Sequence, residues 1–290
     1  MITLPREREL VGLCQEFIRR PSFSGQERKL ASFVRESMLS FGFDHVEVDY
    51  YGNVIGKITF HDQGPRILFE AQMDHVEVAD PFEWKYYPFG AFIDHDRIYG
   101  RGATDQKGSL AAMLCAAAYL KEDHREDLCG EIIVAASVHQ EQFEGVSSRL
   151  IEGKYSPDFV VIGEASSLKI ERGQRGRAEI ELETHGKLAH SSRPSYGVNA
   201  AGNMVSLLTM ISVLFRPSTD PFLGEGILEL TNLLSFPEKS AGTIPEKCRA
   251  IFDRRLLVGE TEKDVLEQIQ EIIDFARKKN PDIQASLSIS

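Results

Sequence analysis

The chain is poor in cysteine and has no long apolar run. Its 290 residues include four scattered cysteines without C-x-x-C spacing, at Cys14, Cys115, Cys129 and Cys248. This usage argues against a cysteine-type zinc site and is typical of the reducing cytosol, so we expect a cytoplasmic protein. No apolar run approaches the roughly 20 residues that span a bilayer, and early charges interrupt any signal-peptide core. We therefore expect no membrane partner.

Positive charge is also in deficit. Lysine and arginine total 33 against 44 aspartate and glutamate, so the net charge is 33 − 44 = −11. With no basic stripe to neutralise phosphates, nucleic acid is not an expected partner. Hydrophobic residues make up 42% of the chain, which is ordinary for a globular protein. The length fits one large domain or two medium ones.

Three apolar runs in the first half each end in a polar or acidic tip. Ile67–Phe69 leads to Gln72 and Asp74, and the run 131–138 leads to Gln140 and Glu141. A third run, Phe159–Ile162, leads to Glu164. These runs predict buried strands; helical spacing predicts one helix near 6–19, before them, and another near 109–120, between the first and second runs. The first half therefore indicates an α/β fold, with a ligand site at the carboxyl ends of its strands.

Four carboxylates converge on that predicted edge. Asp105 lies between the glycine turns of the run 100–108, just ahead of an Ala-rich helix, and joins Asp74, Glu141 and Glu164. Carboxylates gathered in one place repel each other and would need a cation. Hard oxygen ligands suit divalent metals. The alternatives are that Asp105 caps the following helix and that the other acids are solvated strand ends.

The pattern changes after about residue 173. Apolar and acidic residues alternate along 178–183, which predicts a half-exposed antiparallel strand. Helices near 199–215 and 262–279 and strands near 227–231 and 248–256 complete a βαββαβ-like order. We therefore predict a catalytic-type domain at 1–174 and a smaller α+β domain at 175–290. Earlier in the chain, Ser24 and Glu27 form an S-x-x-E pattern that predicts a capping box for a helix ending near Leu39.

These motifs resemble those of the metal-dependent aminoacylase and carboxypeptidase family, which includes acetylornithine deacetylase and succinyl-diaminopimelate desuccinylase. The shared features, in order, are a strand, a D-x-V motif at Asp74, an aromatic loop, the run YGRGATDQKG at 99–108 and an Ala-rich helix. The resemblance covers nearly the whole chain. The run 171–177 is most similar to the branch linked to selenium metabolism.

The resemblance implies a zinc-peptidase-like catalytic domain with a central mixed sheet, plus a lid and dimerisation domain. It also implies two divalent metals, zinc or else cobalt or manganese, bridged by Asp105. Glu164 would bind one metal and Glu141 the other, while Asp74 would orient a metal-binding histidine from behind. The implied reaction is hydrolysis of an amide bond in an N-acyl amino acid or short peptide by a metal-bound hydroxide.

This sequence departs from the family pattern at three places. Gln72 stands where a metal-binding histidine is expected, and Gln140 stands where the general base is expected. A late histidine ligand is also missing. His75 and His139 are adjacent to the vacated positions, but neighbouring strand residues point to opposite faces. Three readings stay open: a metal-dependent hydrolase, an inactive homologue that dimerises or binds a ligand, and a split gene whose remainder is on another chain.

His190 lies in a G-K-x-A-H-S-S-x-P segment, 186–194, of the predicted lid. In the family this histidine reaches a partner subunit's active site, so the resemblance gives His190 a substrate-facing role. We expect a homodimer through the lid, at the edge strand Glu179–Glu183 or the helix near Asn199. We also expect the sheet of the first domain to be incomplete and to expose an edge.

Overall fold

The computed structural model describes residues 3–60, 64–124, 126–238 and 242–289. The chain divides into two compact units, 1–169 and 170–290, each with a core of its own. The sequence predicted a boundary five residues later, after 174. Within the described ranges, no helix is long and apolar enough to cross a membrane.

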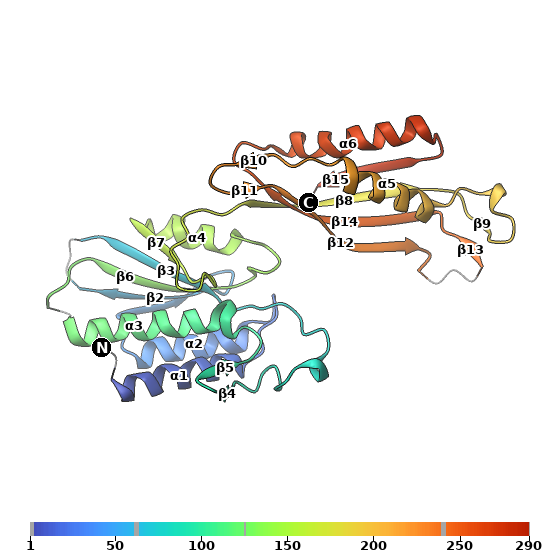
Figure 1. The fold of residues 1–290 in the computed structure, drawn as a ribbon. Helices are drawn as coiled ribbons and strands as arrows, with labels where there is room; N and C mark the ends of the chain where they lie inside the picture. The colour runs from blue at the N-terminus through green and yellow to red at the C-terminus, as the bar shows by residue number, and fades with distance from the viewer. Residues whose placement is uncertain (1–2, 61–63, 125, 239–241, 290) are drawn as a thin grey trace. The chain divides into compact units, whose positions relative to one another are not determined.

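The first unit is a mixed five-stranded sheet with helices on both faces (Figure 1). The strand order is β1-β2-β6-β3-β7; β1, β2 and β6 are antiparallel, whereas β6, β3 and β7 are parallel. The strands are β1 His45–Val48, β2 Val54–Thr59, β3 Arg66–Gln72, β6 Glu131–Ser137 and β7 Phe159–Ile162, and a small ribbon pairs β4 Phe92–Asp94 with β5 Arg97–Tyr99. The helices are α1 Leu4–Ile18, α2 Arg28–Ser40, α3 Gly108–His124 and α4 Val146–Tyr155.

The main core of this unit lies between α1–α3 and one face of the sheet. Phe17, Leu30 and Leu110 are fully buried there against Val134 of β6. A smaller cluster on the other face packs strand residues of β2, β3 and β6 against Ile151 of α4. Burial on both faces explains the unbroken apolar run of β6. The sequence pattern did not predict α4.

Strand β7 is the free parallel edge of this sheet. It pairs with β3 on one side, and within the described ranges no strand pairs with its other side. All four residues are exposed, from 44% at Val161 to 62% at Phe159. The prediction of a buried strand was therefore wrong for β7, although the predicted exposed edge is present. A short apolar run signals a strand without telling whether both faces are covered.

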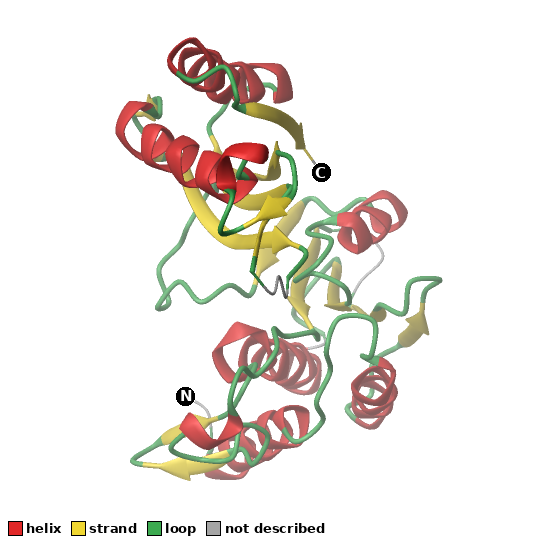
Figure 2. Cartoon of the chain, turned by 90° about the vertical axis from the view of Figure 1, so that its right-hand side faces the viewer, coloured by secondary structure: helices red, strands yellow, loops and turns green. Residues whose placement is uncertain are grey.

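The second unit is a two-layer α+β structure. Its sheet order is β12-β14-β8-β15, with all neighbours antiparallel. Both helices lie on the same side of this sheet (Figures 1 and 2). The main elements are β8 Gly176–His185, α5 Ala200–Leu214, β12 Ile227–Phe236, β14 Lys247–Leu256, α6 Glu262–Lys279 and β15 Gln284–Ile289. Two short ribbons pair β9 Ala189–His190 with β13 Thr243–Ile244, and β10 Thr219–Asp220 with β11 Gly224–Glu225.

The alternation predicted for β8 is confirmed. Ile180 and Leu182 are fully buried under α5 and α6, whereas Glu181 and Glu183 lie on the opposite face. There Glu181 pairs with Arg249 of β14 at 3.5 Å. The predicted dimer edge at Glu179–Glu183 is wrong, however, because β8 pairs with β14 on one side and with β15 on the other. The edges of this sheet are β12 and β15.

A capping box is present at one helix and absent at the helix for which it was predicted. Helix α6 begins after a capping box, in which the Thr261 hydroxyl and the Asp264 carboxylate each receive the other's backbone N–H. The capping box predicted at Ser24 is wrong, because α2 starts at Arg28 without a side-chain cap. Ser24 instead donates to Asp74, and Glu27 accepts from the backbone N–H of His139.

Candidate functional site

The predicted acidic tips gather at the carboxyl ends of β3, β6 and β7. These strands are neighbours and parallel, so Asp74, Glu141 and Glu164 follow them at one edge of the sheet. Asp105 joins them from the irregular helical turn Ala103–Lys107 that precedes α3. We call Asp105, Glu141 and Glu164 the carboxylate rim.

Two glycines shape the turn that carries Asp105. Gly102 has φ +77°, a conformation that side-chain-bearing residues rarely adopt. A Cβ at Gly108 would lie 2.6 Å from the carbonyl oxygen of Ala103, so a side chain there would displace the backbone. The backbone N–H of Lys107 donates to the Gly102 carbonyl at 2.9 Å, which closes the turn. The glycines around Asp105 therefore have a structural reason.

Asp74 supports the site from behind. It is fully buried, and its Oδ2 accepts hydrogen bonds from the Ser24 hydroxyl at 2.7 Å and the Glu141 N–H at 3.0 Å. Its Oδ1 accepts from the Gln140 N–H at 3.1 Å. Asp74 thus holds the loop after β6, and this arrangement leaves it directed at protein backbone.

The rim carboxylates disfavour one another's ionisation. Burial first, and then the charges of Asp105 and Asp74, raise the pKa of Glu141 to about 7. Burial and the Asp74 charge raise the pKa of Asp105, and burial and the Asp105 charge raise that of Glu164. Arg101 acts in the opposite direction on Glu141 and Asp105. The Asp105 charge thus acts on both other members of the rim, and the Asp74 charge acts on Asp105 and Glu141.

Two glutamine amides occupy the rim. The buried Gln72 at the end of β3 donates from Nε2 to Glu141 Oε1 at 3.1 Å. Gln106 donates from Nε2 to Glu164 Oε1 at 2.5 Å, and its Oε1 accepts from the Gln72 backbone N–H at 3.2 Å. The sequence analysis missed Gln106 because nothing but its position beside Asp105 signals this role. Together the amides satisfy carboxylates that would otherwise face each other.

The Gln140 side chain is turned to its own loop. Its amide oxygen accepts from the Gly145 N–H at 3.1 Å, just before α4. The neighbouring histidines do not replace the missing groups. His75 is buried, accepts from the Ser22 N–H through Nε2 and packs on Phe23. The ring of His139 lies beside Phe143.

The fit of a zinc centre can be tested against these contacts. A catalytic zinc takes about three protein ligands. Within the ranges that the structure describes, no group of three or more His, Cys, Asp or Glu residues is arranged to hold a metal. The amides of Gln72 and Gln106 moreover donate to two of the expected ligands. As arranged, these residues do not fit the zinc pair that the resemblance implies.

The other residues considered from the sequence have structural contacts. Tyr86 stacks on Phe92 and donates to Asp94, so it serves loop packing. Arg254 is buried and pairs with Glu260 at 2.6 Å. His190, in β9 of the second unit, is exposed and has its Nδ1 2.8 Å from the Ser192 hydroxyl. It is not among the side chains that the first unit brings together.

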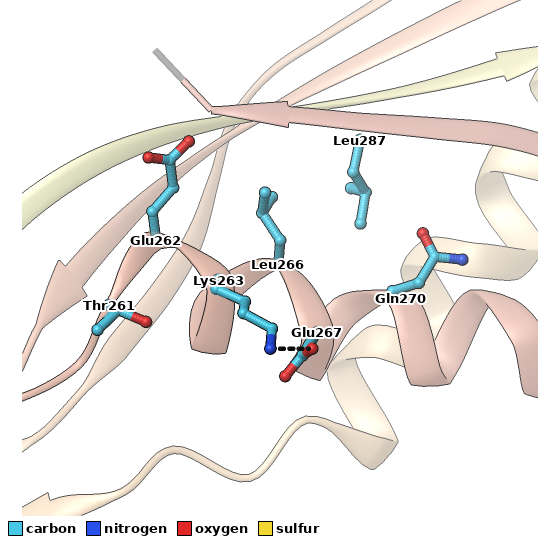
Figure 3. A pocket seen from close by; sticks show the side chains of 7 residues that line it. All are labelled: Thr261, Glu262, Lys263, Leu266, Glu267, Gln270 and Leu287. Atoms are coloured by element: carbon cyan, nitrogen blue, oxygen red, sulfur yellow. Dashed lines mark ion pairs between the residues drawn. The ribbon is translucent and has the colours of Figure 1, made fainter.

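A hollow of about 620 Å³ in the second unit does not provide the predicted chemistry (Figure 3). It lies beside α6 and β15, and its polar groups include the ion pair of Lys263 with Glu267. Neither histidine nor cysteine lines it. Its lining residues are Thr261, Glu262, Lys263, Leu266, Glu267, Gln270 and Leu287.

Comparisons with known proteins agree with this fold. The chain is 32% identical over 268 residues to the uncharacterized protein YgeY of Escherichia coli K12, an alignment covering 91% of this chain and 65% of YgeY. The chain thus spans about two thirds of that relative's length. It superposes with a TM-score of 0.74 on the M20 family metallo-carboxypeptidase Sso-CP2 of Sulfolobus solfataricus, at 17% identity, covering 97% of this chain and 77% of that one.

A third similar structure is YxeP of Bacillus subtilis, described as a dinuclear metal-binding peptidase of the M20 family. Its TM-score is 0.66 at 14% identity, with 99% of this chain and 74% of that one covered. The model of the peptidase dimerisation domain matches residues 172–281. The model of the catalytic family matches residues 68–222, more than half of the chain. The chain therefore belongs to peptidase family M20/M25/M40.

Proposed function

We propose that this chain is a ligand-binding member of its family that does not hydrolyse amide bonds by the metal-dependent route. The observation that carries the proposal is the state of Gln140. Its side chain is a neutral amide whose oxygen accepts the Gly145 N–H. An amide cannot take a proton from water near neutral pH, and loss of a general base typically lowers a rate about 10²–10⁴-fold.

Gln72 supports the same proposal from the metal side. Its amide nitrogen donates to Glu141, so it places a hydrogen-bond donor where a metal ligand is expected. Gln106 does the same to Glu164. A divalent cation would have to displace both amides before it could use both carboxylates. The ligand that we propose is a peptide or N-acyl amino acid, the substrate class that the family resemblance implies, held without turnover.

The second candidate is the metal-dependent hydrolase itself, acting on N-acyl amino acids or short peptides. The observation that favours it is the rim, since Asp105, Glu141 and Glu164 remain together with raised pKa values. Uncompensated carboxylates attract a cation, and oxygen ligands suit zinc less than manganese. Under this alternative the two amides turn aside when metal binds. The identity of that metal and a cytoplasmic location stay predictions.

A homodimer is part of the proposal. Its support is the match of residues 172–281 to the peptidase dimerisation domain. With the β8 edge excluded, the predicted alternative near Asn199 is helix α5. Val205 and Val213 on this helix are 59% and 58% exposed, although apolar. Light scattering at micromolar concentration should give twice the monomer mass, and a monomer would contradict the dimer.

Metal counting separates the two candidates. The purified chain is stripped with a chelator, dialysed against trace zinc, manganese and cobalt, and analysed for bound metal, with Asp105→Asn treated identically. The binding proposal predicts the same background metal in both proteins. One or more equivalents per chain, lost in Asp105→Asn, would contradict it and favour the hydrolase.

A further inference from the structure

A second polar pocket lies in the first unit, apart from the carboxylate rim. It is a hollow of about 490 Å³ formed by α2, the end of β1 with its following turn, and the segment after β6. No rim residue lines it, although its His139 precedes Gln140 in the chain. We call it the arginine pocket; its lining residues are Gly25, Glu27, Arg28, Ala31, Ser32, Arg35, Val48, Asp49, Tyr50, Tyr51, Gly52, Val138 and His139.

Two arginines give this pocket its charge. Arg28 and Arg35 lie seven residues apart on α2, about 10 Å along the helix axis, and both line the hollow. In the part of the chain that the structure describes, neither guanidinium group makes a hydrogen bond or ion pair. By contrast, Arg6, Arg20 and Arg177 each pair with a carboxylate. In a chain of net charge −11, the pocket thus has two positive groups that no described carboxylate pairs with.

The acidic residues of the pocket are already engaged. The Asp49 carboxylate accepts from the N–H groups of Tyr51 and Gly52 and from the Asn53 backbone and side-chain amides. Glu27 is 4% exposed and accepts from the His139 N–H at 3.0 Å. Because both carboxylates hold backbone in place, they are poorly available to neutralise Arg28 and Arg35.

An aromatic wall accompanies the charge. Tyr50 is 95% exposed, and its ring meets Tyr51 edge to face with centroids 5.8 Å apart. An exposed ring that lines the same hollow as two guanidinium groups offers a stacking surface together with anion donors. His139 adds a half-buried imidazole to the lining. The pocket therefore combines recognition of an anion with recognition of a flat group.

We propose that the arginine pocket binds a small organic anion in which a carboxylate or phosphate is attached to a planar ring. Arg28 and Arg35 bind the anionic group and Tyr50 stacks on the ring. The proposal goes beyond the proposed function and does not depend on it, because the pocket contains none of the rim residues. Both proposals can therefore be tested on the same protein and fail separately.

The test is calorimetric titration of the full chain with four probes. Phenyl phosphate and benzoate carry both ring and anion and distinguish phosphate from carboxylate. Inorganic phosphate lacks the ring, and benzyl alcohol lacks the charge. We expect one of the two ring anions to bind, and Arg28→Gln with Arg35→Gln to weaken that binding at least about tenfold, a loss of about 1.4 kcal/mol.

The matched control is Arg8→Gln with Arg149→Gln. These arginines are also exposed and carry the same charge, but they lie on α1 and α4 outside the pocket. The control should bind like the unmodified chain, and circular dichroism should show that both variants fold. Equal weakening in the control, or no binding of either ring anion at millimolar concentration, would overturn the proposal.

Tyr50→Ala tests the aromatic part. It should weaken the ring anion that binds and leave inorganic phosphate unchanged, because Tyr50 contacts the flat group alone. If Tyr50→Ala leaves the ring anion unaffected, or if inorganic phosphate binds as tightly as phenyl phosphate, the assignment of a planar ring is overturned.

Discussion

Asp74 and Asp105 lie at the same end of one sheet but differ in their burial and in their hydrogen bonds. Asp74 is fully buried and accepts three hydrogen bonds that hold the segment after β6. Asp105 is exposed by surface area, although the protein atoms around its carboxylate raise its pKa, and no described residue donates a hydrogen bond to that carboxylate. Asp74 therefore has a structural role that Asp105 lacks.

The largest expected effect on stability comes from removing the Asp74 carboxylate. Asp74→Ala should lower the free energy of unfolding by about 3–5 kcal/mol, because the partly buried N–H groups of Gln140 and Glu141 and the Ser24 hydroxyl lose their acceptor. Asp105→Ala, the matched change, should stay within about 0.5 kcal/mol. Urea unfolding of both variants measures the difference. Equal losses would remove the distinction between the two aspartates.

The second unit has its own buried charge, at Arg254. This side chain is fully buried, pairs with Glu260 at 2.6 Å and donates to the backbone carbonyl of Arg255. Arg254→Met should cost about 3 kcal/mol, since it leaves Glu260 without its partner. Arg255→Met is the control, because the Arg255 side chain is 43% exposed and pairs with the less exposed Asp253 at 2.7 Å. A similar loss from both would show that burial does not matter here.

A smaller effect is expected in the pH dependence of stability, which tests the electrostatics of the carboxylate rim. The pKa of Glu141 is raised from 4.5 to about 7 in the folded chain, mainly by burial. Between these values the unfolded carboxyl loses its proton while the folded one keeps it, so the folded state binds more protons. Stability should therefore fall as pH rises through this window, by on the order of 1 kcal/mol once solvent screening is included.

This pH dependence is measured as the difference between the unmodified chain and Glu141→Gln, both in chelator. The variant should lose less stability between pH 4.5 and pH 7 than the unmodified chain. Asp105 and Glu164, whose pKa values are also raised, act in the same direction. Parallel profiles of stability against pH for the two proteins would mean that folding does not raise the pKa of Glu141.

The smallest effect is expected at His190. Its ring is exposed, and among the described residues it hydrogen-bonds to Ser192, two residues away. His190→Ala should change the free energy of unfolding by less than about 0.5 kcal/mol. Thermal unfolding followed by circular dichroism is sufficient to check this. A larger loss would show that His190 has a structural role and would weaken the prediction that it faces a substrate.

The sequence predicted most of the fold because its strongest signals are burial patterns. The apolar run of β6 and the alternation along β8 predict strands of the observed kind. The sequence could not predict which strands lie next to each other in a sheet. Whether β7 has one neighbour or two, and whether β8 is an edge, depends on pairing that a single strand does not encode. Helix α4 was not predicted, and the last strand of the predicted βαββαβ-like order was not located, although β15 alternates with period two.

The sequence predicted which carboxylates belong to the candidate site, but not the hydrogen bonds that their neighbours make. Parallel strand ends placed Asp74, Glu141 and Glu164 together, since neighbouring parallel strands finish at one edge. The direction in which Gln72, Gln106 and Gln140 point depends on hydrogen bonds formed only in the folded chain. Ser24 illustrates the same limit, because its hydroxyl donates to the buried carboxylate of Asp74, which is distant in the sequence, instead of capping the nearby helix.

Turnover tests the central claim most directly. The chain, supplied with zinc, manganese or cobalt, is assayed on a panel of N-acyl amino acids and dipeptides beside Asp105→Asn purified in the same way. The account predicts equal background rates, because Gln140 cannot act as a base and Gln72 and Gln106 occupy the rim. Turnover by the unmodified chain that disappears in Asp105→Asn would contradict it.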